Sequence, residues 1–260
     1  MVTQGDSTIT RRYRRVPRLA VGLAPRSVAA VPPPQPCTVW WAAPIAPDAA
    51  PALVGLLDVH ERERLTRFRR PADRARYLAA HALARLALAP LVGCDPGMLA
   101  FDRTCRCGEP HGKPVLPGGP GFSLSHAGDL VGVAVRPDGP VGLDVEQLRD
   151  VADLDALAAH VRSPTERSRP GLDAAGFFRT WTRKEALVKA TGDGLAAPMT
   201  AITLARHGPV VERWTGPGAP SGPMWLHDLS PAADHPAAVA GPGERAPEIV
   251  EADGDAVLRA

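Results

Sequence analysis

The segment GLDVE at residues 142–146 places two carboxylates where a packed domain normally has apolar side chains. Side chains alternate along a strand, so Leu143 and Val145 share one face while Asp144 and Glu146 share the other. Two carboxylates on one face repel each other, and burying their charge is costly unless it is paired or bound to a metal. The segment therefore predicts a strand that carries a site for a hard divalent cation.

A second charged segment, WTRKEALVK at residues 181–189, has the periodicity of a helix. We expect this helix to run from about Phe177 to Ala190 and to end at Gly192 and Gly194. Its apolar side consists of Phe177, Phe178, Trp181 and Val188. At 100° per residue Glu185 falls on that same side, facing the core, and we predict it to be a third metal ligand.

The alternative for Glu185 is an ion pair with Lys189 on the helix surface, because the two residues are four apart. The positions of the few lysines favour a functional site over a surface ion pair. Among the 30 Lys and Arg residues, only Lys113, Lys184 and Lys189 are lysines. An ammonium group is a compact charge suited to a single phosphate, and arginine does not replace it without loss. Two lysines beside Glu185 therefore indicate phosphate chemistry.

Together these segments resemble the two signature motifs of the 4′-phosphopantetheinyl transferases. Two further segments agree in order and spacing, namely Gly112-Lys113-Pro114 and FSLSHAG at residues 122–128, which resemble the family's Gly-Lys-Pro and Ser-His-Ser/Ala-Gly stretches. The resemblance covers roughly residues 38–242. It is closest to the single-chain type that activates peptide and polyketide synthetases, which serves secondary metabolism and antibiotic biosynthesis.

The resemblance implies an α+β fold of two pseudo-twofold related subdomains with the active site at their interface. We expect a disordered Arg- and Pro-rich leader at 1–36, an N-terminal subdomain at 37–140, a C-terminal subdomain with the metal site at 141–242, and a flexible tail at 243–260. A twin-arginine export signal is the alternative for the leader, although Pro25 and Arg26 interrupt its apolar stretch.

The implied reaction is Mg²⁺-dependent transfer of 4′-phosphopantetheine from coenzyme A to a carrier-protein serine, with release of adenosine 3′,5′-bisphosphate. By resemblance, the Mg²⁺ ligands are Asp144, Glu146 and Glu185. Lys189 would lie against the phosphates and Lys184 near the cofactor. The family's proposed base matches Glu166 in Thr165-Glu166. A metal-bound water or Glu185 is the alternative base, and Glu166 is then an ordinary exposed glutamate.

The rest of coenzyme A is assigned by the same resemblance. Arg64 and Arg76 fall where relatives place contacts to the 3′-phosphate. The segment Gly112, Lys113 and Pro114 would offer backbone groups to adenine and an ammonium to a phosphate. Ser125 and His126 end a predicted strand, where a phosphate contact is expected.

Charge and composition exclude several classes of function. The net charge is +2, but residues 1–36 hold six Arg and one Asp, leaving 24 basic and 27 acidic residues and a net of −3. Such a body is not a general nucleic-acid binder. No stretch approaches the roughly 18 apolar residues of a membrane span. Four cysteines are too few for a disulfide framework, so we expect the reducing cytoplasm. We also expect a monomer.

Two other functions stay open. A zinc site of Cys105, Cys107 and His111 would make a nucleic-acid-binding module, but the spacing is C-x-C and a second ligand pair is missing. A different Mg²⁺-dependent enzyme, such as a pyrophosphate hydrolase, would use the same carboxylates without a carrier protein.

Further elements follow from periodicity and turn residues. Helices are expected at Val54–Arg69, Asp73–Leu91 and Leu154–Val161. Strands are expected at Thr38–Ala42, Gly121–Ser125, Leu130–Val135, Ala201–Ala205, Met224–Leu229 and Ala237–Ala240.

Overall fold

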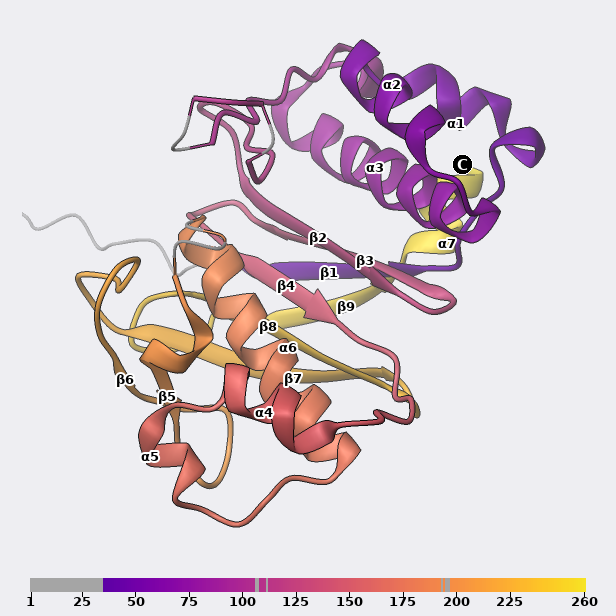
Figure 1. Ribbon diagram of the computed structural model, residues 1–260. Helices are drawn as coiled ribbons and strands as arrows, with labels where there is room; N and C mark the ends of the chain where they lie inside the picture. Colours follow the sequence, from indigo (N-terminus) through magenta and orange to yellow (C-terminus); the bar gives the residue numbers. More distant parts are fainter. Residues whose placement is uncertain (1–34, 106–107, 111, 193, 195–196) are drawn as a thin grey trace, which may run out of the picture. The chain divides into compact units, whose positions relative to one another are not determined.

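The computed structural model describes residues 35–260 apart from 106–107, 111, 193 and 195–196 (Figure 1). Almost all of the predicted leader therefore lies outside the described residues, and so do Cys107 and His111 of the zinc hypothesis. No described helix is both long and apolar enough to cross a membrane.

The first sheet contains four strands in the order β2-β3-β1-β9. These are β2 (Gly121–Ala127), β3 (Leu130–Arg136), β1 (Cys37–Ala42) and β9 (Ile249–Asp253). β3 pairs antiparallel with both β2 and β1, while β9 pairs parallel with β1. The long helix α3 (Pro71–Val92) packs on β2 and β3, and α1 (Pro51–Leu56) and α2 (Val59–Arg67) pack on α3.

The predicted single helix at Val54–Arg69 is in fact two helices. Leu57 has an extended backbone, and Asp58 begins α2 by accepting a hydrogen bond from the Glu61 amide, while the Glu61 side chain accepts from the Asp58 amide. This reciprocal capping box satisfies two amides at the new helix start. The 3₁₀ turns Pro47–Ala49 and Pro96–Met98 complete the helical layer.

The second sheet contains three antiparallel strands in the order β4-β8-β7. These are β4 (Gly142–Val145), β8 (His235–Pro242) and β7 (Met224–Ala232). Helix α6 (Ala174–Thr191) crosses β4 and β8. The hairpin β5 (Ile202–Leu204) and β6 (Val211–Trp214), the helices α4 (Leu154–Val161) and α5 (Pro164–Arg167), and the turn Met199–Ala201 surround α6.

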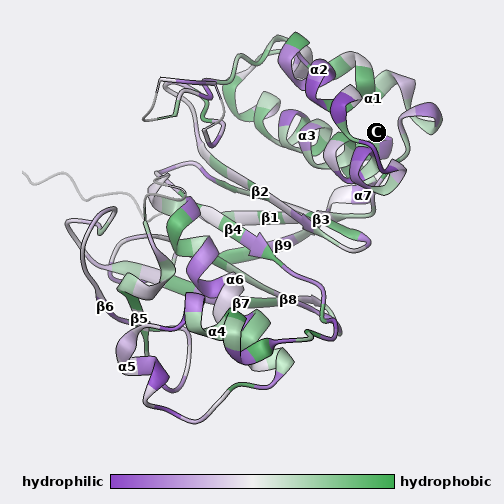
Figure 2. Ribbon diagram, viewed as in Figure 1, coloured by the Kyte–Doolittle hydropathy of each residue, from purple (hydrophilic) through white to green (hydrophobic). Residues whose placement is uncertain are grey.

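The predicted GLDVE strand and signature helix are confirmed as β4 and α6. The helix begins three residues earlier than expected, because the Asp173 carboxylate accepts from the Gly176 amide at 2.7 Å and caps it. It ends at Gly192, whose φ of 77° is the left-handed conformation that favours glycine. Along both long helices, α3 and α6, apolar residues alternate with hydrophilic ones (Figure 2).

Two serine side chains join the sheets where β2 and β4 lie side by side. The Leu143 amide donates to Ser123 Oγ at 3.0 Å, and the Val145 amide donates to Ser125 Oγ at 3.3 Å. Hydroxyls thus take the place of backbone carbonyls along this edge. The serine seam, formed by Ser123 and Ser125, sets the GLDVE strand beside the SHAG segment.

A glycine lets α6 approach β4 closely. A Cβ on Gly142 would lie 1.9 Å from the Ala186 carbonyl oxygen and 2.4 Å from the Ala190 amide nitrogen. Any side chain here would push the helix away from the strand. Gly142 therefore places the last turns of α6, including Lys189, directly on the strand that carries Asp144.

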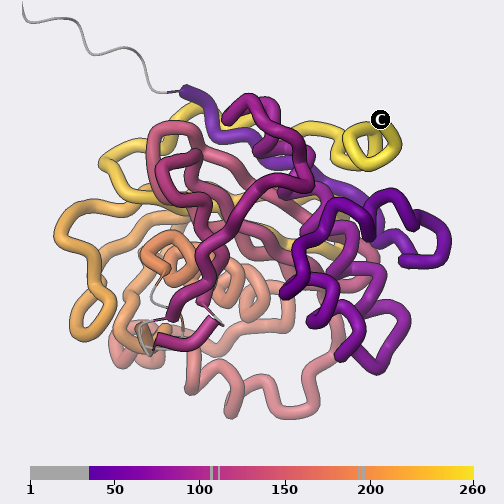
Figure 3. Tube along the Cα trace, turned by 90° about the horizontal axis from the view of Figure 1, so that it is seen from above, coloured from indigo at the N-terminus to yellow at the C-terminus, as the bar shows by residue number. Residues whose placement is uncertain are grey.

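The prediction of a flexible tail at 243–260 is wrong. Residues 249–253 form β9 beside β1, and the helix α7 (Gly254–Arg259) follows at the end of the chain (Figure 3). Leu258 of α7 is buried in the N-terminal core. The Trp41 indole nitrogen donates to the Glu251 carboxylate at 2.7 Å. Composition alone indicated disorder because the partner strand lies more than 200 residues away. The chain's end therefore completes the N-terminal sheet.

The α+β class is confirmed, since mixed sheets and helices build both halves. The four-stranded sheet has the long helix α3 against it, and the three-stranded sheet has α6 against it, while β5 and β6 form a separate two-stranded sheet. The pseudo-twofold relation between the halves stays a prediction.

Candidate active site

Asp144 lies at the centre of a buried polar cluster. Its side chain extends from β4, and Oδ1 accepts hydrogen bonds from Ser125 Oγ at 2.9 Å and from Lys189 Nζ at 2.7 Å. Oδ2 is buried and has no hydrogen-bond partner among the described residues. Burial raises the pKa of Asp144, while Lys189 and Ser125 oppose that rise.

Lys189 connects the signature helix to this cluster. Its ammonium group donates to Asp144, to Ser125 Oγ at 3.0 Å and to the Leu143 carbonyl at 3.0 Å. The alternative in which Lys189 forms a surface ion pair with Glu185 is not what the structure has, because Lys189 pairs with Asp144 across the α6–β4 contact. The i,i+4 spacing is present, but the close approach at Gly142 offers a buried carboxylate instead.

Glu185 and Glu146 lie within electrostatic reach of Asp144. Burial raises the pKa of Glu185, Asp144 and Glu146 add to that rise, and Lys189 opposes it. Glu146 accepts from the exposed Arg149 guanidinium at 2.8 Å. The three predicted ligands are therefore gathered at the junction of β4 and α6.

The three carboxylates are suitable ligands for a hard cation, although their side chains do not converge on one point in this structure. Among the described residues no three His, Cys, Asp or Glu side chains lie close enough together to hold a metal ion. Asp144 nonetheless keeps one buried oxygen without a partner among the described residues, and the charges of Asp144 and Glu146 add to the raised pKa of Glu185. Oxygen ligands and excess negative charge are what Mg²⁺ selects.

Lys184 and Glu166 have a different place from the one expected. Lys184 is fully buried, and its ammonium donates to Glu166 Oε2 at 2.5 Å and to three backbone carbonyls. Those carbonyls belong to Val161, Met199 and Ile202. All donors of Lys184 are thus used inside the protein, so it is not available to coenzyme A. This corrects the assignment of Lys184 as a cofactor-binding residue.

Glu166 is equally occupied. It is 4% exposed, and besides Lys184 it accepts from the Ser163 amide at 2.7 Å and the Leu204 amide at 2.8 Å. The same side chain forms the capping box that begins α5. Glu166 is therefore part of a buried ion pair rather than an exposed glutamate, and its assignment as the catalytic base stays a prediction.

The predicted coenzyme A contacts fall into two places. Lys113 donates to the carbonyls of Val141 at 2.6 Å and Lys189 at 2.9 Å, so it ties the Gly112-Lys113-Pro114 loop to β4 and α6. Burial, with Lys189 nearby, lowers the pKa of Lys113 to about 8. A cavity of about 720 Å³ opens beside this loop, and its lining includes Gly112, Lys113 and Lys189.

Arg76 and His126 lie at the other place. The Arg76 guanidinium donates to the Gly128 carbonyl at 2.6 Å and pairs with Asp73, which holds it against the β2–β3 hairpin. His126 is exposed and within electrostatic reach of Arg76 and Lys189. Arg64 is exposed on α2. The structure therefore places Arg76 and Lys189 within electrostatic reach of His126, and Arg64 within electrostatic reach of Tyr77 on α3.

Ser123 is the residue that sequence reasoning missed. It shares the serine seam with Ser125 and positions the Leu143 amide next to the cluster. The signal was present in the Ser-Leu-Ser spacing, since residues two apart on a strand face the same side. What was missing was the identity of the strand that this face meets.

Comparisons with known proteins agree with the motifs. Residues 140–240 match the family model described as the 4′-phosphopantetheinyl transferase superfamily. The chain is similar to 4′-phosphopantetheinyl transferase HetI of Nostoc sp., with 38% identity over 154 residues that cover 55% of this chain and 63% of HetI. It is 29% identical over 168 residues to a Bacillus subtilis 4′-phosphopantetheinyl transferase, covering 62% of this chain and 71% of that protein.

A third relative is 4′-phosphopantetheinyl transferase AcpT of Escherichia coli, 36% identical over 139 residues that cover 52% of this chain and 66% of AcpT. The matched part thus spans a little less than two thirds of HetI and of AcpT. The resemblance to 4′-phosphopantetheinyl transferases is confirmed, and the family model covers the motifs at residues 142–146 and 181–189.

Proposed function

We propose that this chain, whose residues 140–240 belong to the 4′-phosphopantetheinyl transferase superfamily, transfers the phosphopantetheine arm of coenzyme A to a serine of an acyl or peptidyl carrier protein. The observation that carries the proposal is the buried cluster of Asp144, Ser125 and Lys189 beside Glu185. Carboxylates and an ammonium group together suit a phosphoryl transfer that needs charge neutralisation and positioning.

In the proposed reaction the carrier serine oxygen attacks the β-phosphorus of the coenzyme A pyrophosphate. The bond from that phosphorus to the bridging oxygen breaks, and adenosine 3′,5′-bisphosphate leaves. Asp144, Glu146 and Glu185 would hold Mg²⁺, which when bound neutralises the pyrophosphate oxygens. Lys189 supplies a second positive charge next to Asp144, where its three hydrogen bonds hold it in place.

We propose an acceptor other than Glu166 for the serine proton, because Lys184 and two backbone amides already donate to the Glu166 carboxylate. Glu185 has no hydrogen-bond partner among the described residues, and burial raises its pKa. Both features favour proton uptake by Glu185. A metal-bound water is the alternative acceptor.

The direct test is a mass spectrum of a carrier domain after incubation with this protein, coenzyme A and Mg²⁺. We expect the mass of one phosphopantetheine group to be added. A carrier domain whose acceptor serine is replaced by alanine serves as the control and should stay unmodified. Hydrolysis of coenzyme A without a carrier protein, and no added mass, would contradict the proposal in favour of a pyrophosphate hydrolase.

Arg64→Ala and Arg76→Ala should each weaken binding of coenzyme A by about 1.5–3 kcal/mol, because each is proposed to contact the 3′-phosphate. Binding of 3′-dephospho-coenzyme A should change much less. Calorimetry with the two ligands measures the difference. Arg67→Ala is the matched control, since Arg67 lies on the same helix as Arg64 with a side chain 76% exposed.

Equal losses for both ligands would show that these arginines do not contact the 3′-phosphate. For Arg76 that outcome would point to its hydrogen bond with the Gly128 carbonyl, which holds the hairpin.

A further inference from the structure

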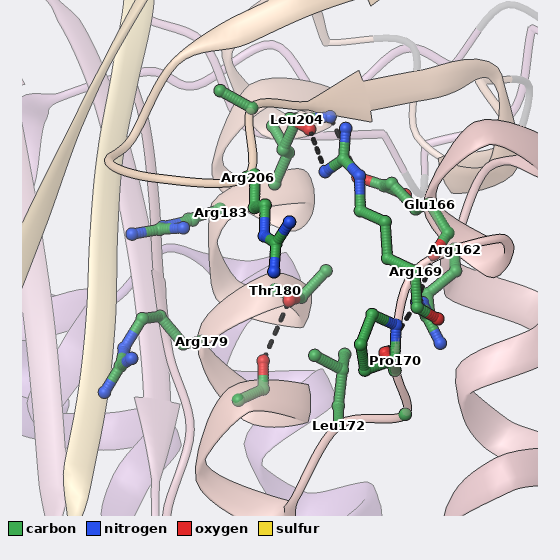
Figure 4. A pocket seen from close by; sticks show the side chains of 13 residues that line it. Arg162, Glu166, Arg169, Pro170, Leu172, Arg179, Thr180, Arg183, Leu204 and Arg206 are labelled. Atoms are coloured by element: carbon green, nitrogen blue, oxygen red, sulfur yellow. Dashed lines mark hydrogen bonds between the residues drawn. The ribbon is translucent and has the colours of Figure 1, made fainter.

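A second cavity lies in the C-terminal half and is not used by the proposed transfer. It has a volume of about 310 Å³ and opens between the α5–α6 loop, the first turns of α6 and the end of β5 (Figure 4). Its lining includes the arginines Arg162, Arg169, Arg179, Arg183 and Arg206. Of the described residues that line it, only Glu166 is acidic, and Lys184 already neutralises that carboxylate.

Three of these arginines are fixed by the protein itself. Arg162 is 9% exposed and donates to the Arg169 and Pro170 carbonyls, both at 3.0 Å. Arg169 donates to the Leu204 carbonyl at 2.8 Å and pairs with the Glu212 carboxylate at 3.1 Å. Arg183 holds Asp228 with two nitrogens. Their guanidinium groups are therefore preorganised, so little side-chain entropy would be lost on binding a ligand.

The other two arginines have free donors. Neither the Arg179 nor the Arg206 guanidinium group has a hydrogen-bond or ion-pair partner within the described part of the chain, and both residues are exposed. Figure 4 shows the Arg206 side chain reaching into the space between Thr180 and Arg169. An uncompensated cation thus projects into a cavity whose walls are already cationic.

The positive charges of this cavity also act on the neighbouring Lys184. Burial lowers the pKa of Lys184 to about 8 against the attraction of Glu166, and Arg162 and Arg169 lower it further. Concentrated like charges destabilise a fold unless an anion neutralises them. The arrangement is therefore one that gains stability when an anion binds.

This cavity is separate from the cluster around Asp144. At 100° per residue along α6, Thr180 lies about 140° from Glu185 and about 180° from Lys189. The two sites thus occupy opposite sides of one helix.

We propose that this cavity, the arginine cavity, binds a small molecule that carries a phosphate monoester group. Guanidinium forks match the oxygens of a phosphate group. The apolar side chains of Pro170, Leu172 and Leu204 line the same space and would cover the organic part of the ligand. The volume lies at the lower end of small-molecule sites, which fits a compact ligand rather than an extended nucleic acid.

The test is calorimetric titration of the full chain with inorganic phosphate at constant ionic strength. The Arg206→Ala variant should bind phosphate about tenfold or more weakly than the unsubstituted protein. Because Arg206 is exposed and unpaired within the described residues, this change should leave folding intact, and circular dichroism checks that. Arg213→Ala is the matched control, since Arg213 is an exposed arginine on β6 outside the cavity.

Lys189→Ala separates the two sites. Phosphate affinity should stay within about twofold in this variant, because Lys189 lies on the other side of α6. Loss of phosphate binding in Lys189→Ala, equal affinity in Arg206→Ala and Arg213→Ala, or no saturable binding in the unsubstituted protein would each overturn the proposal. Unchanged phosphate affinity with slower modification of a carrier domain in Arg206→Ala would show a protein-docking surface instead.

Discussion

Glu185→Gln is expected to lower turnover by at least about 100-fold while the protein stays folded. The substitution keeps the shape of the side chain and removes one negative charge from the proposed three-carboxylate site. Mg²⁺ affinity should fall with it, because a neutral amide is a weaker ligand for a hard cation. Steady-state rates measured across a Mg²⁺ titration give both quantities.

The stability of the Glu185→Gln variant without metal should not fall as its turnover does, but should stay the same or rise. Burial, Asp144 and Glu146 raise the pKa of Glu185 above its ordinary value, so the folded state holds this proton more tightly than the unfolded state does. Stability from this group is therefore present at low pH and is lost as pH rises through the raised pKa. The glutamine variant has no such loss, so in chelator at neutral pH it should unfold at the same or a higher denaturant concentration.

The matched control is Glu63→Gln, since Glu63 is an exposed glutamate that pairs only with the exposed Arg67 among the described residues. It should lose at most about 0.5 kcal/mol and keep full turnover. If Glu185→Gln behaves like Glu63→Gln, with normal turnover and unchanged Mg²⁺ dependence, then Glu185 is not a metal ligand and the proposed mechanism fails.

Lys184→Met is expected to destabilise the protein by about 3–5 kcal/mol, because it leaves the buried carboxylate of Glu166 without its cation. The three carbonyls of Val161, Met199 and Ile202 lose a donor as well. Chemical denaturation measures the loss. Methionine keeps most of the side-chain volume, so the effect is electrostatic rather than a cavity effect.

A double-mutant cycle isolates the ion pair. Glu166→Gln removes the buried negative charge and keeps one oxygen for one of the Ser163 and Leu204 amides, which donate to different oxygens of Glu166. Lys184→Met combined with Glu166→Gln should therefore recover part of the loss. A cofactor-binding role for Lys184 predicts the reverse pattern, namely normal stability with a raised KM for coenzyme A. That pattern would show that our structural assignment of Lys184 is wrong.

Local sequence was enough to locate the elements that carry the site. The apolar alternation around Leu143 predicted a strand, and the spacing of Phe177, Trp181 and Val188 predicted the helix on which Glu185 sits. Both signals act over a few residues, because strand pleat and helical twist are properties of neighbouring backbone units. The order of the four motifs was also sufficient to recognise the family.

The interactions between side chains on different helices and strands could not be predicted from local sequence. Lys184 and Lys189 are five residues apart and chemically identical, yet one forms a buried pair with Glu166 and the other lies on Asp144. Helical rotation separates them by about 140°, and only the contact of α6 with β4 on one side and with α5 on the other decides what each ammonium meets.

The sequence by itself thus determined the resemblance to the transferases, the α+β class, and the strand and helix that bear the three carboxylates. Tertiary structure alone decided that Gly142 admits α6, that the serine seam joins the sheets, that residues 249–253 pair with β1, and that five arginines line one cavity. The physical reason is the distance along the sequence over which each interaction acts. Periodicity and capping depend on residues within one or two turns of chain. The partner of a buried charge depends on which distant segments the fold packs against it.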